Sequence, residues 1–483
     1  MQEKDNRKPA RKKKIRSYPI IILSVFYCCL LASLLAYVCY YAGNNKQELM
    51  NNSYNTRQQI LLAQNTRGKI LSRDGDVLAY TSLDEYGKEK RVYPYGKEFA
   101  HVVGYSTNGK AGIEASENYY LINTSIDLQD KVALDTQGEK YPGDNVYTTL
   151  DVNLQEVAFN ALSARKGAIV VTNPKTGEIL AMVSKPDFDP NTIQQDWASL
   201  LADKSTDAKL LNRATQGLYP PGSTFKIATA LAYIKEHPDN YSDYKFTCNG
   251  KYTYEGETIS CYHGENHGYV DFVSSFAKSC NSSFANIGLE VKRKTFQSTL
   301  KNLMFGEELP LTMNYNKSSA QLDDETESSD VMQLSIGQGA TLVSPMHMNM
   351  ITCSIANKGI LMKPYVVSGV KSETGKEVKS YSSESYKRLM SEKESEILTT
   401  MMEAVVQSGT ASKLKGLTYT AAGKTGSAEF NDSTSDSHAW FTGFAPVEDP
   451  KVCVTIIVED AGSGGSYAVP IAKRIFDAYF GVE

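Results

Sequence analysis

Ser223 and Lys226 are the first side chains of this 483-residue sequence whose types and spacing suit covalent chemistry. They follow a Pro-Pro-Gly turn, and the apolar run 227–234 comes directly after them, as is typical of a buried helix. At the start of such a helix the two side chains share one face. A serine hydroxyl needs a neighbouring base to become a nucleophile, and a lysine can be that base where burial and a second cation lower its pKa. A helix-capping serine followed by a surface lysine explains the same pattern, so other motifs must decide.

Two later motifs supply the remaining groups that acyl-transfer chemistry needs. Ser279-Cys280-Asn281 offers a hydroxyl and an amide, and Lys424-Thr425-Gly426-Ser427 offers a cation. Either motif alone has an ordinary structural explanation, a helix cap for the first and a strand end with a glycine bend for the second. The order Ser-x-x-Lys, Ser-x-Asn, Lys-Thr-Gly is that of penicillin-binding proteins and serine β-lactamases. On these motifs the chain resembles a class B penicillin-binding protein, a monofunctional peptidoglycan D,D-transpeptidase, with Cys280 at the variable middle position.

The resemblance implies catalytic roles for four side chains. Ser223 attacks the penultimate carbonyl of a stem peptide that ends in D-Ala-D-Ala, and Lys226 accepts the serine proton. Ser279 relays that proton to the nitrogen of the leaving D-Ala. Lys424 binds the substrate carboxylate and helps to keep Lys226 neutral. The acyl group then passes to an amine of a neighbouring stem peptide, which makes the crosslink, and β-lactam antibiotics acylate the same serine.

The resemblance also implies substrate-binding roles for the residues around these four. Asn281 holds the peptide backbone, and Thr425 and Gly426 lie beside the cation that binds the carboxylate. Backbone N–H groups of Ser223 and Ser427 stabilise the oxyanion, where the loss of one donor typically costs about 2.7–4 kcal/mol. The family needs no metal and no other cofactor, so none is expected.

The order of the predicted elements favours an α/β fold. Strands are predicted at 167–171, 179–183 and 452–458, and helices at 223–235, 271–293, 391–408, 469–480 and directly after Asp151 as N-cap. Strands at both ends with helices between them suit one antiparallel sheet to which both ends contribute. The resemblance implies that this is the penicillin-binding and serine β-lactamase-like transpeptidase fold.

The first 42 residues predict a membrane anchor with a basic tail. Residues 1–17 carry eight Lys or Arg against two acidic residues, and residues 18–42 contain no charged side chain. A helix of that length spans the ~30 Å hydrocarbon core, and it is longer than the apolar part of a cleavable signal peptide. The positive-inside rule places the N-terminus in the cytoplasm and residues 43–483 outside, as a single-pass protein of the bacterial plasma membrane. The membrane explains the basic tail, so no nucleic acid partner is expected.

The remainder divides into a small β-rich domain, 43–147, and the transpeptidase domain, 148–483. Residues 67–79 alternate around an Asp-Gly turn, which predicts a hairpin, and they resemble a segment near the membrane of class B proteins. We expect this first domain to be a non-catalytic pedestal or dimerisation domain. It is too short for a glycosyltransferase, and the resemblance points to a polytopic membrane glycan polymerase as partner.

Cysteine and histidine residues raise two further possibilities. Cys248 and Cys261 flank a polar, hairpin-like loop and could form a disulfide outside the cell, a bridge that the sequence leaves open. Cys261, His263 and His267 have plausible spacing for metal ligands, but the region reads as a loop and no fourth ligand is evident.

Two other functions compete with the transpeptidase interpretation. A class D-type β-lactamase or β-lactam sensor also carries Ser-Thr-Phe-Lys, but such proteins usually have Ser-x-Val at 279–281 and lack the segment 67–79. A non-catalytic scaffold for a membrane glycan polymerase is disfavoured by intact Ser223, Lys226 and Lys424. The motifs do not distinguish roles in elongation, division and sporulation.

Overall fold

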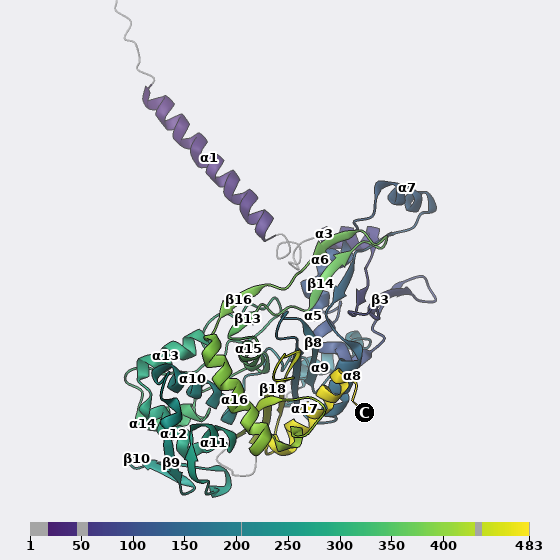
Figure 1. The fold of residues 1–483 in the computed structure, drawn as a ribbon. Coiled ribbons are helices and arrows are strands. Elements are labelled where there is room, and N and C mark those ends of the chain that lie inside the picture. Colours follow the sequence, from purple (N-terminus) through teal and green to yellow (C-terminus); the bar gives the residue numbers. More distant parts are fainter. Residues whose placement is uncertain (1–17, 46–56, 204, 430–436, 483) are drawn as a thin grey trace, which may run out of the picture. The chain divides into compact units, whose positions relative to one another are not determined.

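The computed structural model describes residues 18–45, 57–203, 205–429 and 437–482. Contacts divide the chain into two units, Met1–Gln58 and Gln59–Glu483. The main element of the first unit is α1 (Tyr18–Asn44), an exposed helix of 27 residues (Figure 1). It is about 40 Å long at 1.5 Å per residue, and its length and apolar composition allow it to cross a membrane. The basic tail, 1–17, lies outside the described residues.

The second unit begins with a six-stranded sheet. Its strands, in spatial order, are β15 (Glu377–Ser380), β14 (Val367–Lys371), β6 (Asn145–Thr148), β2 (Ile70–Leu71), β3 (Val77–Leu83) and β4 (Glu89–Val92). β2 and β3 form the antiparallel hairpin that the Asp-Gly turn predicts. β14 pairs with β6, so a segment from late in the chain completes a sheet that otherwise belongs to its first part. That pairing is absent from the sequence-based prediction.

A buried ionic cluster ties α5 (Gly112–Ser116) to this sheet. Arg67 Nε donates to Glu114 Oε2 at 2.6 Å, and Arg91 Nε on β4 donates to Glu114 Oε1 at 2.7 Å. The Glu114 side chain is 0% exposed. Burial alone raises the pKa of Glu114, but the two guanidinium groups outweigh it and hold that pKa below its ordinary value. The carboxylate therefore stays ionised and serves the stability of the fold.

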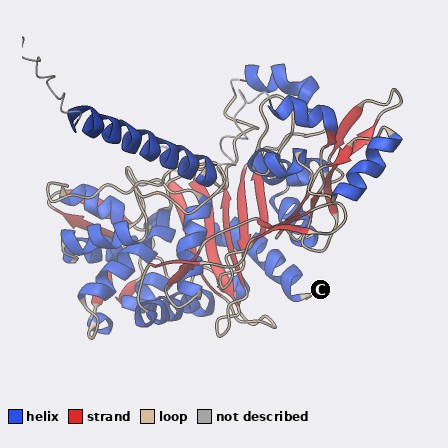
Figure 2. Cartoon of the chain, turned by 90° about the horizontal axis from the view of Figure 1, so that it is seen from above, coloured by secondary structure: helices blue, strands red, loops and turns tan. Residues whose placement is uncertain are grey.

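A five-stranded antiparallel sheet forms the centre of the region that contains the three motifs. Its strands, in spatial order, are β17 (Ala422–Glu429), β18 (Ser437–Ala445), β19 (Val452–Val458), β7 (Gly167–Thr172) and β8 (Ile179–Lys185). Strands from both ends of the region thus pair, as predicted. Every residue of β7, β8, β18 and β19 is buried, so both faces of the sheet are covered, and Figure 2 shows the strands among helices.

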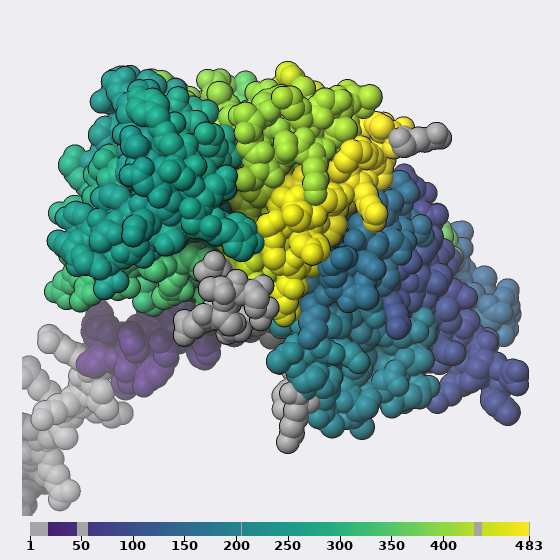
Figure 3. Space-filling view, turned by 90° about the horizontal axis from the view of Figure 1, so that it is seen from below, coloured from purple at the N-terminus to yellow at the C-terminus, as the bar shows by residue number. Residues whose placement is uncertain are grey.

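Helices from different parts of the chain lie against this sheet. α8 (Val152–Leu162) begins after Asp151, whose side chain accepts from Leu154 N at 3.0 Å, as predicted for an N-cap. α17 (Gly464–Phe480) contacts α8 and the strands, and it starts earlier than the predicted 469. The yellow C-terminal residues accordingly lie beside blue residues from the early part of the unit (Figure 3). α15 (Pro345–Ala356) contacts β19 and β18.

The predicted continuous helix over 271–293 is wrong. The chain forms α11 (Phe272–Ala277) and then α12 (Asn281–Glu290), with a break between them. Ser279 has φ +57°, a left-handed conformation that ends the first helix. Cys280 Sγ accepts from Ser283 N at 3.4 Å and so caps the second helix. The break projects Ser279 out of the helical path.

The other two long predicted helices form with small changes of bounds. α10 (Lys226–Glu236) is preceded by a 3-10 turn, η2 (Gly222–Phe225), and α16 (Glu392–Ser408) starts with a capping box between Ser391 and Glu394. The remaining helical elements are α3 (Arg57–Gln64), η1 (Gly96–Phe99), α4 (Ala100–Val103), α6 (Asn118–Ile122), α7 (Leu128–Gln137), α9 (Ile193–Ala202), η3 (Tyr241–Asp243), η4 (Tyr262–Gly264), α13 (Arg293–Asn302), α14 (Ser328–Ser335) and η5 (Ser412–Leu414). The remaining strand pairs are β1 (Asn65–Thr66) with β5 (Tyr141–Pro142), β9 (Lys245–Cys248) with β12 (Gly268–Asp271), β10 (Lys251–Tyr254) with β11 (Glu257–Ser260), and β13 (Ile360–Met362) with β16 (Ser385–Arg388).

Candidate active site

Ser223 lies in η2, which leads directly into α10. Residues i and i+3 of a 3-10 turn eclipse one another, so Ser223 and Lys226 project from one side. Pro221 occupies the N-cap position of η2, which makes no side-chain capping hydrogen bond. The helix-capping explanation of Ser223 is therefore wrong. The serine instead lines a cleft of about 640 Å³.

Two glycines let the Ser223 turn fit against neighbouring segments. Gly426 on β17 approaches the turn so closely that a Cβ there would lie 2.9 Å from Pro221 O. Gly337 has φ +75°, and a Cβ there would lie 2.2 Å from Gly222 O. Its carbonyl accepts from Gly222 N at 2.9 Å. Gly337 was not among the predicted site residues, although the glycine-rich run 336–339 could have indicated it.

The Lys226 amine lies behind the cleft, fully buried, and has three oxygen partners. It donates to Ser279 O and Asn281 Oδ1, both at 2.7 Å, and to Ser279 Oγ at 3.3 Å. Burial disfavours the ammonium form and lowers the pKa of Lys226 to about 7. A substantial fraction of this lysine is therefore a neutral amine near neutral pH, as a general base requires.

Lys424 reaches the same hydroxyl from β17. Its amine donates to Ser279 Oγ at 2.9 Å and to Thr425 O at 3.0 Å. The Lys424 side chain is fully buried, and burial together with the charge of Lys226 lowers its pKa well below the ordinary value. Two ammonium ions at one hydroxyl repel each other, so near neutral pH the two lysines are not both in the ammonium form.

Asn281 links this centre to the edge of the cleft. Its carbonyl accepts from Lys226, and its Nδ2 donates to Ser260 O at 3.0 Å, at the end of β11. Ser260, Thr425, Gly426 and Ser427 line the same cleft. The arrangement offers a hydroxyl nucleophile, amines of lowered pKa and a polar surface for an extended peptide.

The structure brings together all eight residues that the sequence analysis singled out. Six line the cleft, namely Ser223, Ser279, Asn281, Thr425, Gly426 and Ser427. Lys226 and Lys424 are buried and reach Ser279 from behind. The capping explanation of Ser279 is also wrong, because Cys280 is the N-cap of α12.

Comparison with known proteins identifies the class to which this fold and cleft belong. Residues 167–477 match the penicillin binding protein transpeptidase domain, and residues 67–146 match the penicillin binding protein A dimerisation domain. The chain therefore belongs to the penicillin-binding protein transpeptidases, which are serine-type acyltransferases. The family, the fold class and the enzyme class expected from the motifs are confirmed.

Particular relatives share most of the chain. Peptidoglycan D,D-transpeptidase PbpA of Mycolicibacterium smegmatis is 30% identical over 452 residues, which cover 87% of this chain and 91% of that protein. The D,D-transpeptidase domain of a peptidoglycan glycosyltransferase from Eggerthella lenta aligns with a TM-score of 0.76 and 29% identity, over 87% of this chain and 99% of that one. The ceftriaxone acyl-enzyme of penicillin-binding protein A from M. tuberculosis aligns with a TM-score of 0.78 and 27% identity, over 86% and 98%.

Proposed function

We propose that this protein crosslinks peptidoglycan stem peptides by D,D-transpeptidation through an acyl-enzyme on Ser223, and that β-lactams acylate the same residue. The observation that carries the proposal is the meeting of Lys226 and Lys424 at the Ser279 hydroxyl, in the cleft that Ser223 lines. The relatives named as D,D-transpeptidases and the β-lactam acyl-enzyme of a similar protein support it.

Acylation begins with removal of the Ser223 proton by the neutral amine of Lys226. Within the described residues Lys226 hydrogen-bonds to Ser279 and Asn281 and not to Ser223 Oγ, so it exchanges one of these partners when it takes the proton. Ser223 Oγ then forms a bond to the penultimate carbonyl carbon of the donor peptide. The bond from that carbon to the terminal D-Ala nitrogen breaks, and the nitrogen receives the proton through the Ser279 hydroxyl.

The chemistry of the donor peptide suggests roles for the other residues of the cleft. The N–H groups of Ser223 and Ser427 are proposed to stabilise the oxyanion. The carboxylate of the donor peptide adds a negative charge beside Lys424 and so favours its ammonium form, which reduces protonation of Lys226. Asn281, Thr425 and Gly426 are proposed to align the peptide along the cleft.

Deacylation uses the same groups in reverse. An amine of a second stem peptide attacks the ester carbon, a C–N bond forms, and the bond from that carbon to Ser223 Oγ breaks. One proton of the amine returns to Ser223 through Lys226 and Ser279. These proposed steps need no oxidant and no metal, and their products are the crosslink and the free enzyme.

The proposal includes a topology and a partner. The charge asymmetry confined to residues 1–17 supports a cytoplasmic N-terminus and an extracytoplasmic transpeptidase domain. An impermeant thiol reagent should label a Lys46→Cys variant in intact cells. A cysteine protected from the reagent would show that the orientation is the opposite one.

A polytopic glycan polymerase is proposed to bind residues 18–147. Co-purification of the two proteins should survive Ser223→Ala and fail when residues 18–147 are replaced by an unrelated anchor.

Mass spectrometry of the full-length protein after addition of penicillin tests the proposed reaction. We expect a long-lived adduct that peptide mapping places on Ser223 and that the Ser223→Ala variant lacks. With a synthetic D-Ala-D-Ala donor and an amine acceptor, the same protein should form the crosslinked product. Rapid release of hydrolysed penicillin would identify a β-lactamase, and a protein without any adduct would be a scaffold.

A further inference from the structure

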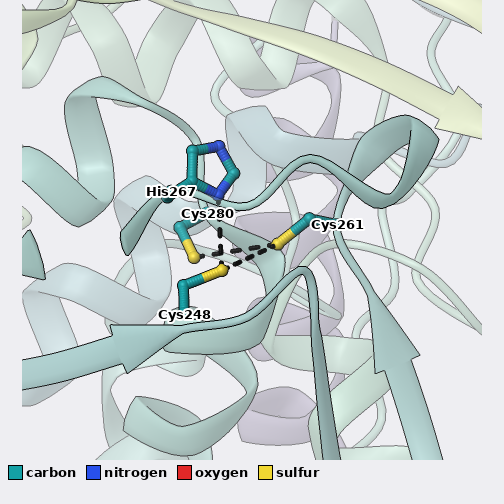
Figure 4. Close-up of side chains that lie close together, drawn as sticks. All are labelled: Cys248, Cys261, His267 and Cys280. Atoms are coloured by element: carbon teal, nitrogen blue, oxygen red, sulfur yellow. Dashed lines mark hydrogen bonds between the residues drawn. The ribbon is translucent and has the colours of Figure 1, made fainter. Parts of the chain in front are cut away.

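Four side chains of the types that ligate metals converge beside the cleft. Cys248, Cys261, His267 and Cys280 each offer one ligand atom, and these atoms all lie within 4.8 Å of one another (Figure 4). They come from the end of β9, the residue after β11, the residue before β12 and the N-cap of α12. We call these four residues the Cys₃His cluster.

The distances within the cluster fit a tetrahedral ion. A zinc ion with Zn–S bonds near 2.3 Å and a Zn–N bond near 2.05 Å places its sulfurs about 3.8 Å apart and its sulfur and nitrogen about 3.6 Å apart. The Sγ atoms of Cys261 and Cys280 are 3.8 Å apart, and those of Cys248 and Cys261 are 3.6 Å apart. Cys248 Sγ lies 3.5 Å from His267 Nδ1. These three distances are those of a tetrahedral zinc site, and no two of the four ligand atoms are more than 4.8 Å apart.

A disulfide does not account for this arrangement. The 3.6 Å between the Sγ atoms of Cys248 and Cys261 is far longer than the 2.05 Å of an S–S bond. A disulfide between them would also not explain why Cys280 and His267 lie beside the same two sulfur atoms. Three thiolates and one imidazole form a soft ligand set that selects Zn²⁺, and four protein ligands are the mark of a closed, structural site.

The surroundings of the cluster suit a bound metal thiolate. Cys248, Cys261 and Cys280 are at most 3% exposed, and the His267 side chain is 5% exposed. Gly250 N and Ser283 N donate to the sulfurs of Cys248 and Cys280, both at 3.4 Å. The second ring nitrogen of His267 lies 3.7 Å from a carboxylate oxygen of Glu265, on the side where metal-binding imidazoles usually have a carboxylate partner, although this distance is longer than a hydrogen bond.

From this geometry we propose that the Cys₃His cluster is a structural zinc site that fastens residues 245–271 to the turn between α11 and α12, which carries Ser279. Cys280 stands between Ser279 and Asn281, the two partners of Lys226. Cys261 follows Ser260, whose carbonyl accepts from Asn281. Two of the four ligands are thus adjacent to residues of the catalytic centre. The segment they hold contains two two-stranded sheets, which are marginal without such a link.

Metal analysis of the purified full-length protein tests this site directly. Protein isolated under reducing conditions should contain about one zinc ion per chain. Cys248→Ser, Cys261→Ser and His267→Ala should each lower that content to near zero. The matched control is His263→Ala, because His263 lies between two ligands in sequence but outside the cluster, and it should keep the zinc. Replacement by Co²⁺ should give the thiolate charge-transfer and d–d absorption bands of a tetrahedral site.

The consequence for catalysis rests on the proposed function and is measured separately. Removal of zinc with a chelator should slow acylation of Ser223 by penicillin at least tenfold, and Zn²⁺ should restore it. A protein that holds zinc but is never acylated would leave the site intact and refute the transpeptidase proposal. A protein that is acylated normally yet takes up neither Zn²⁺ nor Co²⁺ in the reduced state would refute the site, as would a Cys248–Cys261 disulfide in peptide maps of protein from the native membrane.

Discussion

The amines of Lys226 and Lys424 meet at one hydroxyl group, that of Ser279, one from α10 and the other from β17. The distances from their Nζ atoms to Ser279 Oγ are 3.3 and 2.9 Å. A hydroxyl offers two lone pairs and one proton, so it can serve both amines and pass a proton between them. Because both amines are buried, protonation of one disfavours protonation of the other. The Ser279 hydroxyl is therefore the junction of the proposed proton path.

Removal of the Ser279 hydroxyl should slow acylation by penicillin by about 10²–10⁴-fold. The residue has φ +57°, so an alanine there is strained, whereas a glycine is not. Ser279→Ala and Ser279→Gly should therefore lose rate to a similar extent, measured by stopped-flow acylation. If Ser279→Gly acylated at the parent's rate, the hydroxyl would have no part in the reaction and only the turn would matter.

A side chain at Gly337 should displace the Ser223 turn. A Cβ at this position would lie 2.2 Å from Gly222 O, closer than real Cβ contacts allow. Gly337→Ala should lower both the melting temperature and the acylation rate, the latter at least tenfold.

The matched control for this prediction is Gly339→Ala. Gly339 also has a positive φ, +68°, but the nearest atom to its Cβ would be 3.5 Å away. Its alanine variant carries the backbone strain of about 1–2 kcal/mol without the clash. Equal loss of acylation in both variants would show that strain, and not contact with the Ser223 turn, is responsible.

The chemistry of the site was predictable because it resides in short motifs, but its geometry was not. Ser223, Lys226, Ser279 and Lys424 follow from their order and spacing. The helical pattern of apolar residues continues through 271–293, and no local signal marks Ser279 for a left-handed conformation, which is uncommon for a residue with a side chain. The break in that helix is nevertheless what turns the Ser279 hydroxyl toward both lysines.

Long-range pairing was equally invisible in the sequence. β14 resembles any short strand, and its partner β6 lies more than 200 positions earlier. Spacing in the sequence indicates two members of the Cys₃His cluster, Cys261 and His267, as plausible metal ligands. It does not indicate Cys248 and Cys280 as ligands, because they meet the other two only when β9 and α12 are folded. Of the two histidines that the Cys261, His263 and His267 spacing suggests, the structure places His267 in the cluster and His263 outside it.

Glu114 should contribute several kcal/mol to stability. Glu114→Gln leaves Arg67 and Arg91 buried without their anion, and the loss of one partner of a buried ion pair typically costs about 3–5 kcal/mol. The melting temperature at neutral pH should fall markedly. Glu384→Gln is the control, because its pair with Lys363 is largely exposed and spans 3.7 Å, and it should change stability by less than about 1 kcal/mol.

The pH dependence of this contribution has a definite sign. The pKa of Glu114 is lowered in the folded state, so its stabilisation is complete above the pKa of the unfolded chain and is lost as the pH falls through the folded value. The difference in melting temperature between the parent and Glu114→Gln should therefore persist at pH 5 to 8 and shrink in strong acid. A difference that shrinks instead as the pH rises would contradict the assignment.

The rate of acylation by penicillin against pH, for the parent and for Lys226→Arg, tests the central claim most directly. The pKa of Lys226 is lowered to about 7, and the neutral amine is the base, so the parent's rate should rise through neutral pH and then level off. Arginine keeps the positive charge but is not deprotonated in proteins, so Lys226→Arg should lose about 10²–10⁴-fold and the rise with it. Lys235→Arg, on the same helix, should match the parent. A Lys226→Arg variant that acylates at the parent's rate with the parent's pH profile would show that Lys226 is not the base.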